Sequence, residues 1–293
     1  MEHTPFRAMP GASLPAAYMT AETSSFVDFL RVQAPHLLPG GGGLGAVEPV
    51  RARQLADLTP QPPHGTTIVA MTFDGGVLIA GDRRATSGNL IAQRDMDKVF
   101  VADTYSAVGI AGTAGLAVEM VRIYQVELSH YEKLEGVSLS LDAKTNKLAA
   151  MVRGNLDAAL QGLAAIPLFV GYDVDASDPA RAGRIVSFDV VGGRYEERAG
   201  FHGVGSGSLF ARSALKKLWD PGCDEDAAIS MAIEALYDAA DDDSATGGPD
   251  LARRIYPQIV TITAAEGAVH LSEDRVAEVT ESVVTARTSQ PRG

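Results

Sequence analysis

The most reactive arrangement in the chain is a threonine, Thr66, that directly follows Gly65. If the bond between these two residues is cut, Thr66 carries both a hydroxyl and a free α-amine. An α-amine has a pKa of about 8, so it can take the hydroxyl proton near neutral pH. A cut here therefore predicts a nucleophile that carries its own general base, whereas an uncut Thr66 is an ordinary strand residue.

An acidic and a basic residue are placed where they could act on this threonine. Asp82 ends the next predicted strand, so a hairpin returns it to the neighbourhood of Thr66, and Lys98 opens the strand after that. A lysine beside Thr66 would favour the alkoxide and lower the pKa of a nearby amine, and a carboxylate would keep that lysine charged and oriented. The competing interpretation of Asp82 and Lys98 is a surface ion pair.

Two glycine-containing segments could supply further groups. Gly112 closes a strand where a helix begins, so its backbone N–H could point at a developing oxyanion; the alternative is a glycine that only permits a tight turn. The run 203–208 also precedes a helix, but it lacks the GxGxxG spacing and any P-loop lysine. We expect Ser206 in this run to be a hydrogen-bonding support residue, with plain turn glycines as the alternative.

An acidic run, 241–248, ends another predicted helix. A calcium loop is excluded, because Ala245 stands where a ligand is needed and Thr246 where a glycine is needed. Three aspartates at a helix C-terminus oppose the helix dipole, so the run needs a partner such as Lys98 or a bound amine. The plainer interpretation is a solvated helix end with a glycine stop.

Composition excludes several classes of protein. The chain has 293 residues, of which 46% are apolar, and its net charge of −12 argues against a nucleic-acid-binding surface. The single cysteine, Cys223, cannot form an internal disulfide, and the six histidines show no metal-ligand spacing, so we expect a cytoplasmic protein without metal or cofactor. Because no apolar run approaches the ~20 residues of a membrane span, we expect no membrane partner.

The first 65 residues differ in texture from the rest. They hold nine of the fifteen prolines, no lysine and a run of four glycines, a composition that cannot build its own core. Only 24–30 is helix-prone, with serine caps ahead of an apolar face. Two interpretations are open: a flexible tail, or a propeptide whose short helix packs on the body and is later removed.

From Thr66 onward, strands and helices alternate in blocks. This order predicts an α+β fold in which helices cover antiparallel sheets, rather than a regularly alternating parallel sheet. Strands are expected at 66–73, 77–81, 98–102, 105–111, 168–172, 184–190, 194–201, 256–263 and 268–271, and helices at 114–132, 141–164, 209–218, 225–240 and 273–287.

Five motifs in register, from Thr66 to about Leu271, resemble a proteasome β subunit, and the long segment before the threonine looks most like the actinobacterial type. The motifs are Thr66 to Ala70, Ala80 to Arg84 with Lys98, Gly109 to Gly112, Gly205 to Ser208 and Asp243 to Gly247. The resemblance implies an N-terminal nucleophile hydrolase: a four-layer α/β/β/α sandwich of two antiparallel sheets between helical layers. It also implies autocatalytic cleavage between Gly65 and Thr66, with 1–65 as propeptide and 66–293 as the mature domain.

Catalytic roles follow from the resemblance, position by position. Thr66 would be the nucleophile, with its amine taking the proton directly or through water, and Asp82 and Lys98 would be the charge pair that tunes it. Gly112 would donate its N–H to the oxyanion. The supporting network around the amine would consist of Ser206, Asp243 and Thr246, which stands where many β subunits carry serine.

The resemblance also places the substrate. Thr86 and Ala114 would offer backbone groups that hold the peptide as an added strand. The first specificity pocket would be formed by Ala85, Met96, Ile110, Ala114 and Val118. Because these side chains are apolar, we expect cleavage after hydrophobic residues.

The resemblance implies that the chain works inside stacked heptameric rings, with two β rings between two rings of α subunits. A ring ATPase would deliver substrates tagged with a ubiquitin-like protein. Three alternatives are kept: a non-catalytic structural ring subunit, another N-terminal nucleophile amidohydrolase, and the simpler bacterial protease ring driven by an unfoldase. The joint presence of Thr66, Asp82 and Lys98 argues against the first, and the long leader argues against the last.

Overall fold

Strand β1 (Thr67–Phe73), which follows the candidate nucleophile, lies inside a five-stranded antiparallel sheet. The computed structural model describes residues 65–289, and all of them belong to one compact unit, Pro60–Gly293. In this first sheet the strands run in the order β10-β1-β2-β11-β12. Its other members are β2 (Gly76–Gly81), β10 (Phe201–Gly205), β11 (Gln258–Thr263) and β12 (Gly267–His270).

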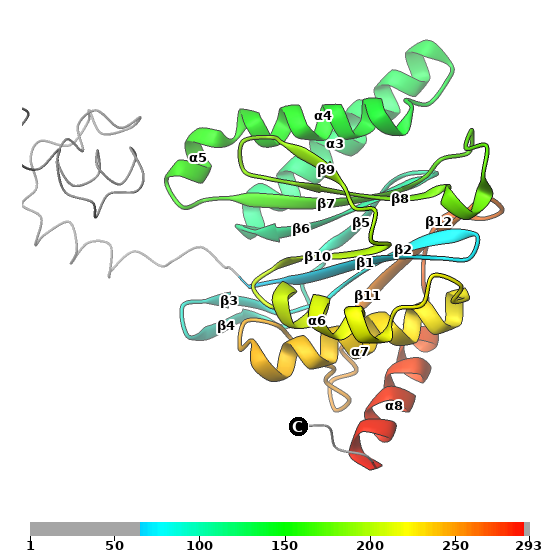
Figure 1. Ribbon diagram of the computed structural model, residues 1–293. Coiled ribbons are helices and arrows are strands. Elements are labelled where there is room, and N and C mark those ends of the chain that lie inside the picture. The colour runs from blue at the N-terminus through cyan, green and yellow to red at the C-terminus, as the bar shows by residue number, and fades with distance from the viewer. Residues whose placement is uncertain (1–64, 290–293) are drawn as a thin grey trace, which may run out of the picture. The chain divides into compact units, whose positions relative to one another are not determined.

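A second five-stranded antiparallel sheet lies face to face with the first (Figure 1). Its order follows the chain, β5-β6-β7-β8-β9, so each strand pairs with its neighbour in sequence. Its members are β5 (Val99–Asp103), β6 (Ser106–Gly112), β7 (Ala165–Tyr172), β8 (Gly183–Phe188) and β9 (Arg194–Glu196). A separate two-stranded hairpin is made by β3 (Ala85–Ser87) and β4 (Leu90–Gln93).

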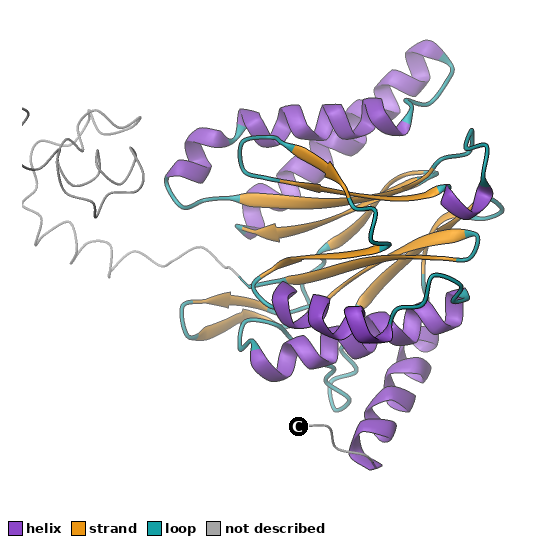
Figure 2. Ribbon diagram, in the orientation of Figure 1, coloured by secondary structure: helices purple, strands orange, loops and turns teal. Residues whose placement is uncertain are grey.

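Helices cover the outer face of each sheet, which completes four layers (Figure 2). The first sheet is covered by α6 (Ser208–Leu218), α7 (Glu225–Asp242) and α8 (Glu273–Ser289). On the second sheet lie α3 (Ala114–Glu135) and α4 (Leu141–Gly154), followed by the short α5 (Leu156–Leu160); a single 3₁₀ turn, η3, spans Pro179–Arg181. The expected four-layer α+β sandwich is therefore confirmed.

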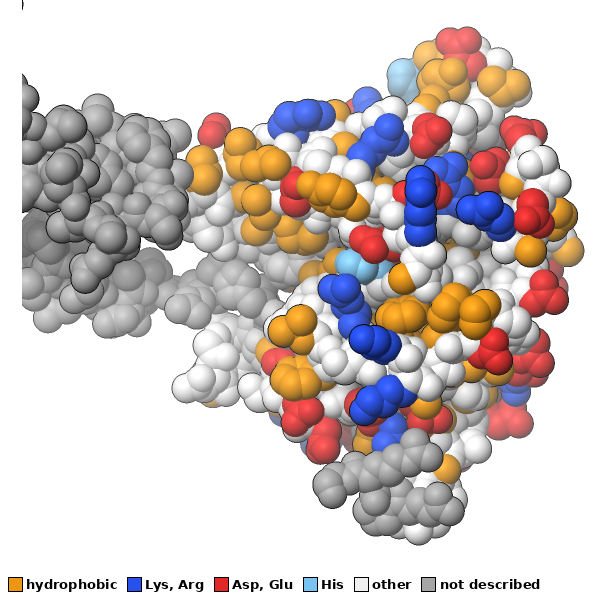
Figure 3. Space-filling model, in the orientation of Figure 1, with side chains coloured by type: hydrophobic (Ala, Val, Ile, Leu, Met, Phe, Trp, Pro, Cys, Tyr) orange, Lys and Arg blue, Asp and Glu red, His pale blue; other side chains and the backbone are white. Residues whose placement is uncertain are grey.

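Large apolar side chains remain exposed on both helical layers, and Figure 3 shows apolar side chains at the surface of each. On α3, Val126 is 67% exposed and Leu134 is 70% exposed; on α6, Leu209 is 72% exposed. Apolar surface of this kind is typical of faces that other chains cover. Within residues 65–289, no helix combines the length and apolar character that crossing a bilayer requires.

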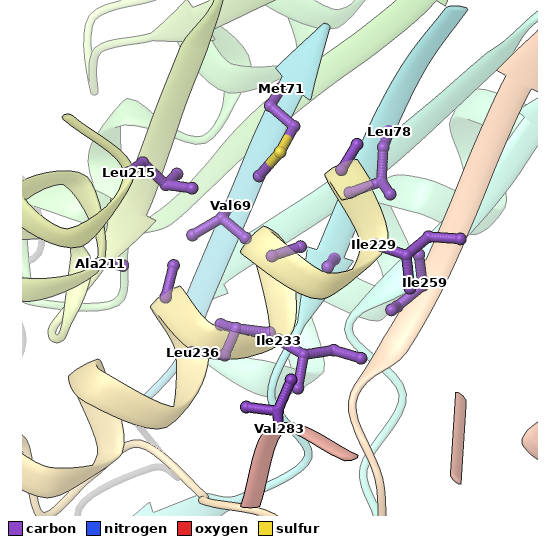
Figure 4. Close-up of a cluster of buried hydrophobic side chains, with 14 of the residues drawn as sticks. Val69, Met71, Leu78, Ala211, Leu215, Ile229, Ile233, Leu236, Ile259 and Val283 are labelled. Atoms are coloured by element: carbon purple, nitrogen blue, oxygen red, sulfur yellow. The ribbon is translucent and has the colours of Figure 1, made fainter. Parts of the chain in front are cut away.

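Alternation along the strands explains why the first sheet is apolar on both faces. Val69 and Met71 pack with the helices that cover the first sheet, in the cluster that Figure 4 shows. Ile68 and Ala70, one residue out of phase, pack between the two sheets. Successive side chains of a strand point to opposite faces, so β1 must be apolar throughout to be buried on both sides.

Helix boundaries follow capping chemistry. The Ser140 side chain accepts the Ala143 N–H at the start of α4, and Asp224 accepts the Ala227 N–H at the start of α7. At the end of α3, Gly136 has a left-handed φ of 71° and donates its N–H to the Glu132 carbonyl.

Two element predictions were wrong. The segment 194–201, expected as one strand, holds only β9 and the first residue of β10, and these two strands belong to different sheets: β9 pairs with β8, and β10 pairs with β1. The chain crosses between the sheets through Gly200, whose φ is +83°, and the first three residues of the run 203–208 belong to β10. The helix expected over 141–164 ends at Gly154; the remainder holds the short α5 and a turn that leads into β7.

Sequence patterns also missed the short hairpin β3–β4, since β4 is exposed along its whole length and has no buried alternation to reveal it. The helix expected at 24–30 lies outside the described residues.

Candidate active site

Thr66 lies directly before β1 and is buried, with 5% of its surface exposed. Its carbonyl accepts the Ser206 N–H at 2.9 Å, which fixes its backbone against the start of α6. Its hydroxyl oxygen lies 2.6 Å from the carbonyl oxygen of Gly65, to which it donates. The hydroxyl is therefore held beside the one peptide bond whose cleavage would free the Thr66 amine.

Gly65 is required by its conformation as well as by its size. Its φ is +106°, in the region that favours glycine. A Cβ at this position would lie 2.7 Å from Thr86 Oγ1 and 2.9 Å from the Ala245 carbonyl oxygen. The bond before Thr66 therefore passes through a narrow gap between the β3 strand and the loop after α7.

Lys98 and Asp82 form a buried ion pair beside this bond. The Lys98 ammonium donates to Asp82 Oδ1 at 2.7 Å, to the Gly65 carbonyl at 3.0 Å and to the Arg84 carbonyl. The two side chains are 2% and 0% exposed, so the interpretation as a surface ion pair is wrong. Burial lowers the pKa of Lys98, and the adjacent Asp82 carboxylate opposes that shift.

Asp82 joins three segments of the chain. Its Oδ1 accepts the Thr67 N–H at 2.8 Å in addition to Lys98. Its Oδ2 accepts the Arg84 N–H at 2.9 Å and the Gly247 N–H at 2.8 Å. Four donors on one buried carboxylate satisfy it fully, as a buried charge requires.

A second network joins the remaining predicted support residues. Asp243, at the C-terminal end of α7, accepts the hydroxyls of Ser206 and Thr246, each at 2.6 Å. Burial raises the pKa of Asp243, but the hydrogen bonds from Ser206 and Thr246 outweigh it and hold that pKa below its ordinary value. The partners of the acidic helix end are therefore two hydroxyls. The more distant positive charge of Lys98 also lowers the pKa of Asp243.

Gly112 ends β6 with a φ of +114°, and a Cβ there would lie 2.2 Å from the Ala164 carbonyl oxygen. The backbone geometry therefore demands glycine at this turn, as the plainer interpretation held. Gly112 also lines the same hollow as Thr66 and Lys98. Its role as an oxyanion donor stays a prediction.

The hollow beside Thr66 brings the predicted specificity residues together. The five predicted residues all line it: Ala85, Met96, Ile110, Ala114 and Val118. Gly65, Asp97, Phe100 and Ala117 line it as well. Thr86 lies on β3 at the Gly65 side of the site, where its hydroxyl limits the space around Gly65. Apart from Thr66, Asp97 and Lys98, the residues that line this hollow are apolar or glycine.

Sequence reasoning missed three residues of the network. Thr67 shares a 2.6 Å hydrogen bond with Thr246 through their hydroxyls and accepts the Gly207 N–H at 3.1 Å. Arg84 and Gly247 contact Asp82 through backbone N–H groups. Their places within one or two residues of Thr66, Asp82 and Thr246 were the available signal. Over residues 65–289, no cluster of three or more His, Cys, Asp or Glu is placed to hold a metal ion.

The known proteins to which the chain is similar are proteasome subunits. The family described as Proteasome subunit matches residues 63–250. The chain is 66% identical over 291 residues to the proteasome subunit beta of Saccharomonospora viridis, covering 99% of each chain. It is 64% identical over 284 residues to that of Saccharopolyspora erythraea (97% and 96% covered) and 58% identical over 286 residues to that of Acidothermus cellulolyticus (97% and 95% covered).

Proposed function

The chain belongs to the proteasome subunit family, and we propose that it is a catalytic β subunit of the 20S core, a threonine endopeptidase made as a precursor. One observation carries the proposal. The Thr66 hydroxyl lies 2.6 Å from the Gly65 carbonyl oxygen, and the Lys98 ammonium lies 3.0 Å from the same oxygen. A nucleophile and a positive charge thus meet at the bond whose cleavage would create the active residue.

Cleavage of this bond starts from the hydroxyl. Thr66 Oγ1 attacks the Gly65 carbonyl carbon, the C–N bond breaks, and the acyl group moves to oxygen as an ester. Water then hydrolyses the ester, which leaves a carboxylate on Gly65 and a free amine and hydroxyl on Thr66. No free amine exists during this step, so a water held among Asp82, Lys98 and Ser206 takes the hydroxyl proton and passes it to the leaving nitrogen. Residues 1–65 leave as propeptide, and 66–293 remain as the mature domain.

Substrate hydrolysis repeats this chemistry with the new amine as base. Thr66 Oγ1 attacks the scissile carbonyl while its proton passes to the amine, directly or through water. The oxyanion receives the Gly112 N–H, the leaving amine takes the proton, and water hydrolyses the resulting ester. The Lys98 ammonium favours the alkoxide, and Asp82 holds that lysine in place. Ser206, Asp243 and Thr246 orient the amine.

Specificity follows from the walls of the hollow. Small and aliphatic side chains, including Ala114, Met96 and Val118, line it beside Thr66. A hydrophobic side chain before the scissile bond gains from burial there, whereas a charged one loses hydration. We therefore infer cleavage after hydrophobic residues, with the substrate strand held by the backbone of Thr86 and Ala114.

Assembly provides the chamber in which this chemistry is confined. Apolar residues such as Val126 on α3 and Leu209 on α6 are exposed, as expected of faces that neighbouring subunits cover. The partners are α subunits and further β subunits in heptameric rings, with a ring ATPase that delivers proteins carrying a ubiquitin-like tag. We place the complex in the cytoplasm.

Intact mass of the full chain, expressed with and without its α subunit, tests the proposal. We expect a chain that begins at Thr66 in the assembled complex and peptidase activity that appears with it. A full-length chain with undiminished activity would refute the mechanism. An assembled but inactive complex would identify a structural ring subunit, and turnover of small amides by the isolated chain would identify an amidohydrolase.

A further inference from the structure

Arg84 contacts both sides of the buried Asp82–Lys98 pair, and we propose that its guanidinium is a positioning group that holds the loop Ser244–Gly247 against that pair. The inference rests on the proposed function, because it concerns the rate of that reaction. Arg84 does not line the hollow beside Thr66, so its effect must pass through the residues that it holds.

The backbone of Arg84 is part of the charge pair's surroundings. Its N–H donates to Asp82 Oδ2 at 2.9 Å, and its carbonyl accepts from the Lys98 ammonium. A residue of any type could make these two backbone contacts, so they do not explain why an arginine stands here.

The guanidinium explains it through the loop after α7. Nη1 of Arg84 donates to the carbonyls of Ser244 at 3.0 Å and Thr246 at 3.1 Å. A single guanidinium nitrogen carries two N–H groups in one plane, which suits two carbonyls of one loop. The carbonyls at 244 and 246 are thereby fixed relative to β2 and β3, which lie far away in the sequence.

The loop held in this way returns to the charge pair. Gly247 donates its N–H to Asp82 Oδ2 at 2.8 Å, and Thr246 donates its hydroxyl to Asp243 at 2.6 Å. Gly247 also packs directly against Arg84, because a Cβ at Gly247 would lie 2.7 Å from Arg84 Cβ. Arg84, the loop and Asp82 therefore form one closed set of contacts, and releasing the guanidinium frees the loop from one side of it.

Charge adds a second effect. Burial is the main cause that lowers the pKa of Lys98, and the positive charge of Arg84 lowers it further. Two other arginines line the small surface hollow behind the site, but only Arg84 reaches the loop. Arg83 donates to the carbonyls of Asp95 and Met96, and Arg94 makes no side-chain hydrogen bond or ion pair with the residues the structure describes. Arg94 therefore carries the same positive charge as Arg84 but does not bond the loop, so it can serve as the control position.

Kinetics of the assembled complex test the proposal. For Arg84→Ala we expect kcat to fall about tenfold or more, as loss of a charge-assisted hydrogen bond predicts, with KM within about twofold. The alkaline limb of the kcat–pH profile moves to higher pH, because the mechanism needs the charged ammonium and the charge that lowers the pKa of Lys98 is gone. Arg84→Lys keeps the charge and loses the second carbonyl contact, so it lowers kcat without moving the profile. Arg94→Ala leaves kcat and the profile unchanged.

Three outcomes are distinguishable. If Arg84→Ala assembles, is processed at Thr66 and matches the wild type in kcat and pH profile, the positioning role is overturned. If it fails to assemble, Arg84→Lys supplies the test, and kcat equal to wild type overturns the role. If the wild-type complex itself gives no chain beginning at Thr66 and no peptidase activity, the proposed function fails instead.

Discussion

The ammonium of Lys98 bridges the Asp82 carboxylate and the carbonyl oxygen of Gly65, at 2.7 Å and 3.0 Å. A buried lysine in this place has two tasks: it balances the charge of Asp82, and it withdraws electron density from the bond before Thr66. Both tasks need a compact cation on a stem of this length, because the ammonium also reaches the Arg84 carbonyl. We therefore expect the proposed processing step to depend on Lys98 before any substrate is bound.

Replacing Lys98 with alanine should stop processing. The Lys98→Ala chain loses the positive charge on the Gly65 carbonyl and leaves Asp82 buried without its partner. Intact mass of the assembled complex should show the full-length chain. Asp82→Asn in the same assay separates the effects, because it spares the lysine while weakening its anchor. A Lys98→Ala chain that is cut at the normal rate would count against the role of Lys98.

Thr66→Ala should abolish both processing and peptide hydrolysis, since it removes the hydroxyl that lies beside the Gly65 carbonyl. Thr66→Ser keeps the hydroxyl and serves as the control; it should still be processed. The measurements are intact mass and turnover of a fluorogenic peptide. Turnover by the Thr66→Ala complex would point to a different nucleophile.

How much of this site can be predicted from the sequence depends on how far apart the contacting residues lie along the chain. Thr66, Asp82 and Lys98 could be placed together because a hairpin brings the start of β1 beside the end of β2, and Lys98 directly precedes β5, the next long strand after the short hairpin β3–β4. The guanidinium of Arg84, in contrast, meets a loop 160 residues away. No periodicity or turn signal encodes such a contact, because tertiary packing alone creates it.

The fold shows the same division between local and long-range contacts. Alternation and glycine-containing turns predicted most elements, since those signals are local. The crossing from β9 to β10 was missed because both short strands have strand-like residues, and the choice of sheet for each is decided by its partner, β8 or β1. Propensity contains no information on that choice.

Thr246→Val should destabilise the chain, whereas Thr246→Ser should not. The Thr246 hydroxyl is buried and bonds both Asp243 and Thr67, so valine removes one buried hydrogen bond from each of them, at a cost of about 1–3 kcal/mol. Urea unfolding of both variants in a Thr66→Ala background measures this cost without interference from processing. Equal stability of the valine and serine variants would show that the network contributes nothing.

Acid stability should depend on Asp243. Its pKa is held below the ordinary value in the folded chain, because hydrogen bonds from Ser206 and Thr246 outweigh the effect of burial. Such a group contributes stability above the unfolded-state pKa of about 3.9, and the contribution is lost as pH falls through the folded pKa. The melting temperature of Asp243→Asn should therefore lie below that of the parent chain at neutral pH, and the difference should shrink in acid. A difference independent of pH would contradict this account.

Val118→Phe should change which substrates are cut. Val118 lines the hollow beside Thr66, so a ring there takes up space that a large hydrophobic side chain would occupy. We expect kcat/KM to fall about tenfold or more for peptides with leucine or tyrosine before the cut, and far less for those with alanine. A panel of matched peptides on wild type and variant measures this. Fastest wild-type cleavage after acidic or basic residues would contradict the apolar pocket itself.

Gly65→Ala should block processing while leaving assembly intact. The added methyl group would meet Thr86 Oγ1 at 2.7 Å and Ala245 Cβ at 2.8 Å, in a left-handed backbone conformation that alanine adopts only with strain. The segment before Thr66 must then shift, which moves the carbonyl away from the Thr66 hydroxyl and the Lys98 ammonium. Gly88→Ala is the control, because Gly88 also has a positive φ of 56° but nothing within 4 Å. Intact mass should show the uncut chain only for Gly65→Ala; normal cutting of this variant would mean that the close fit around Gly65 does not position the bond.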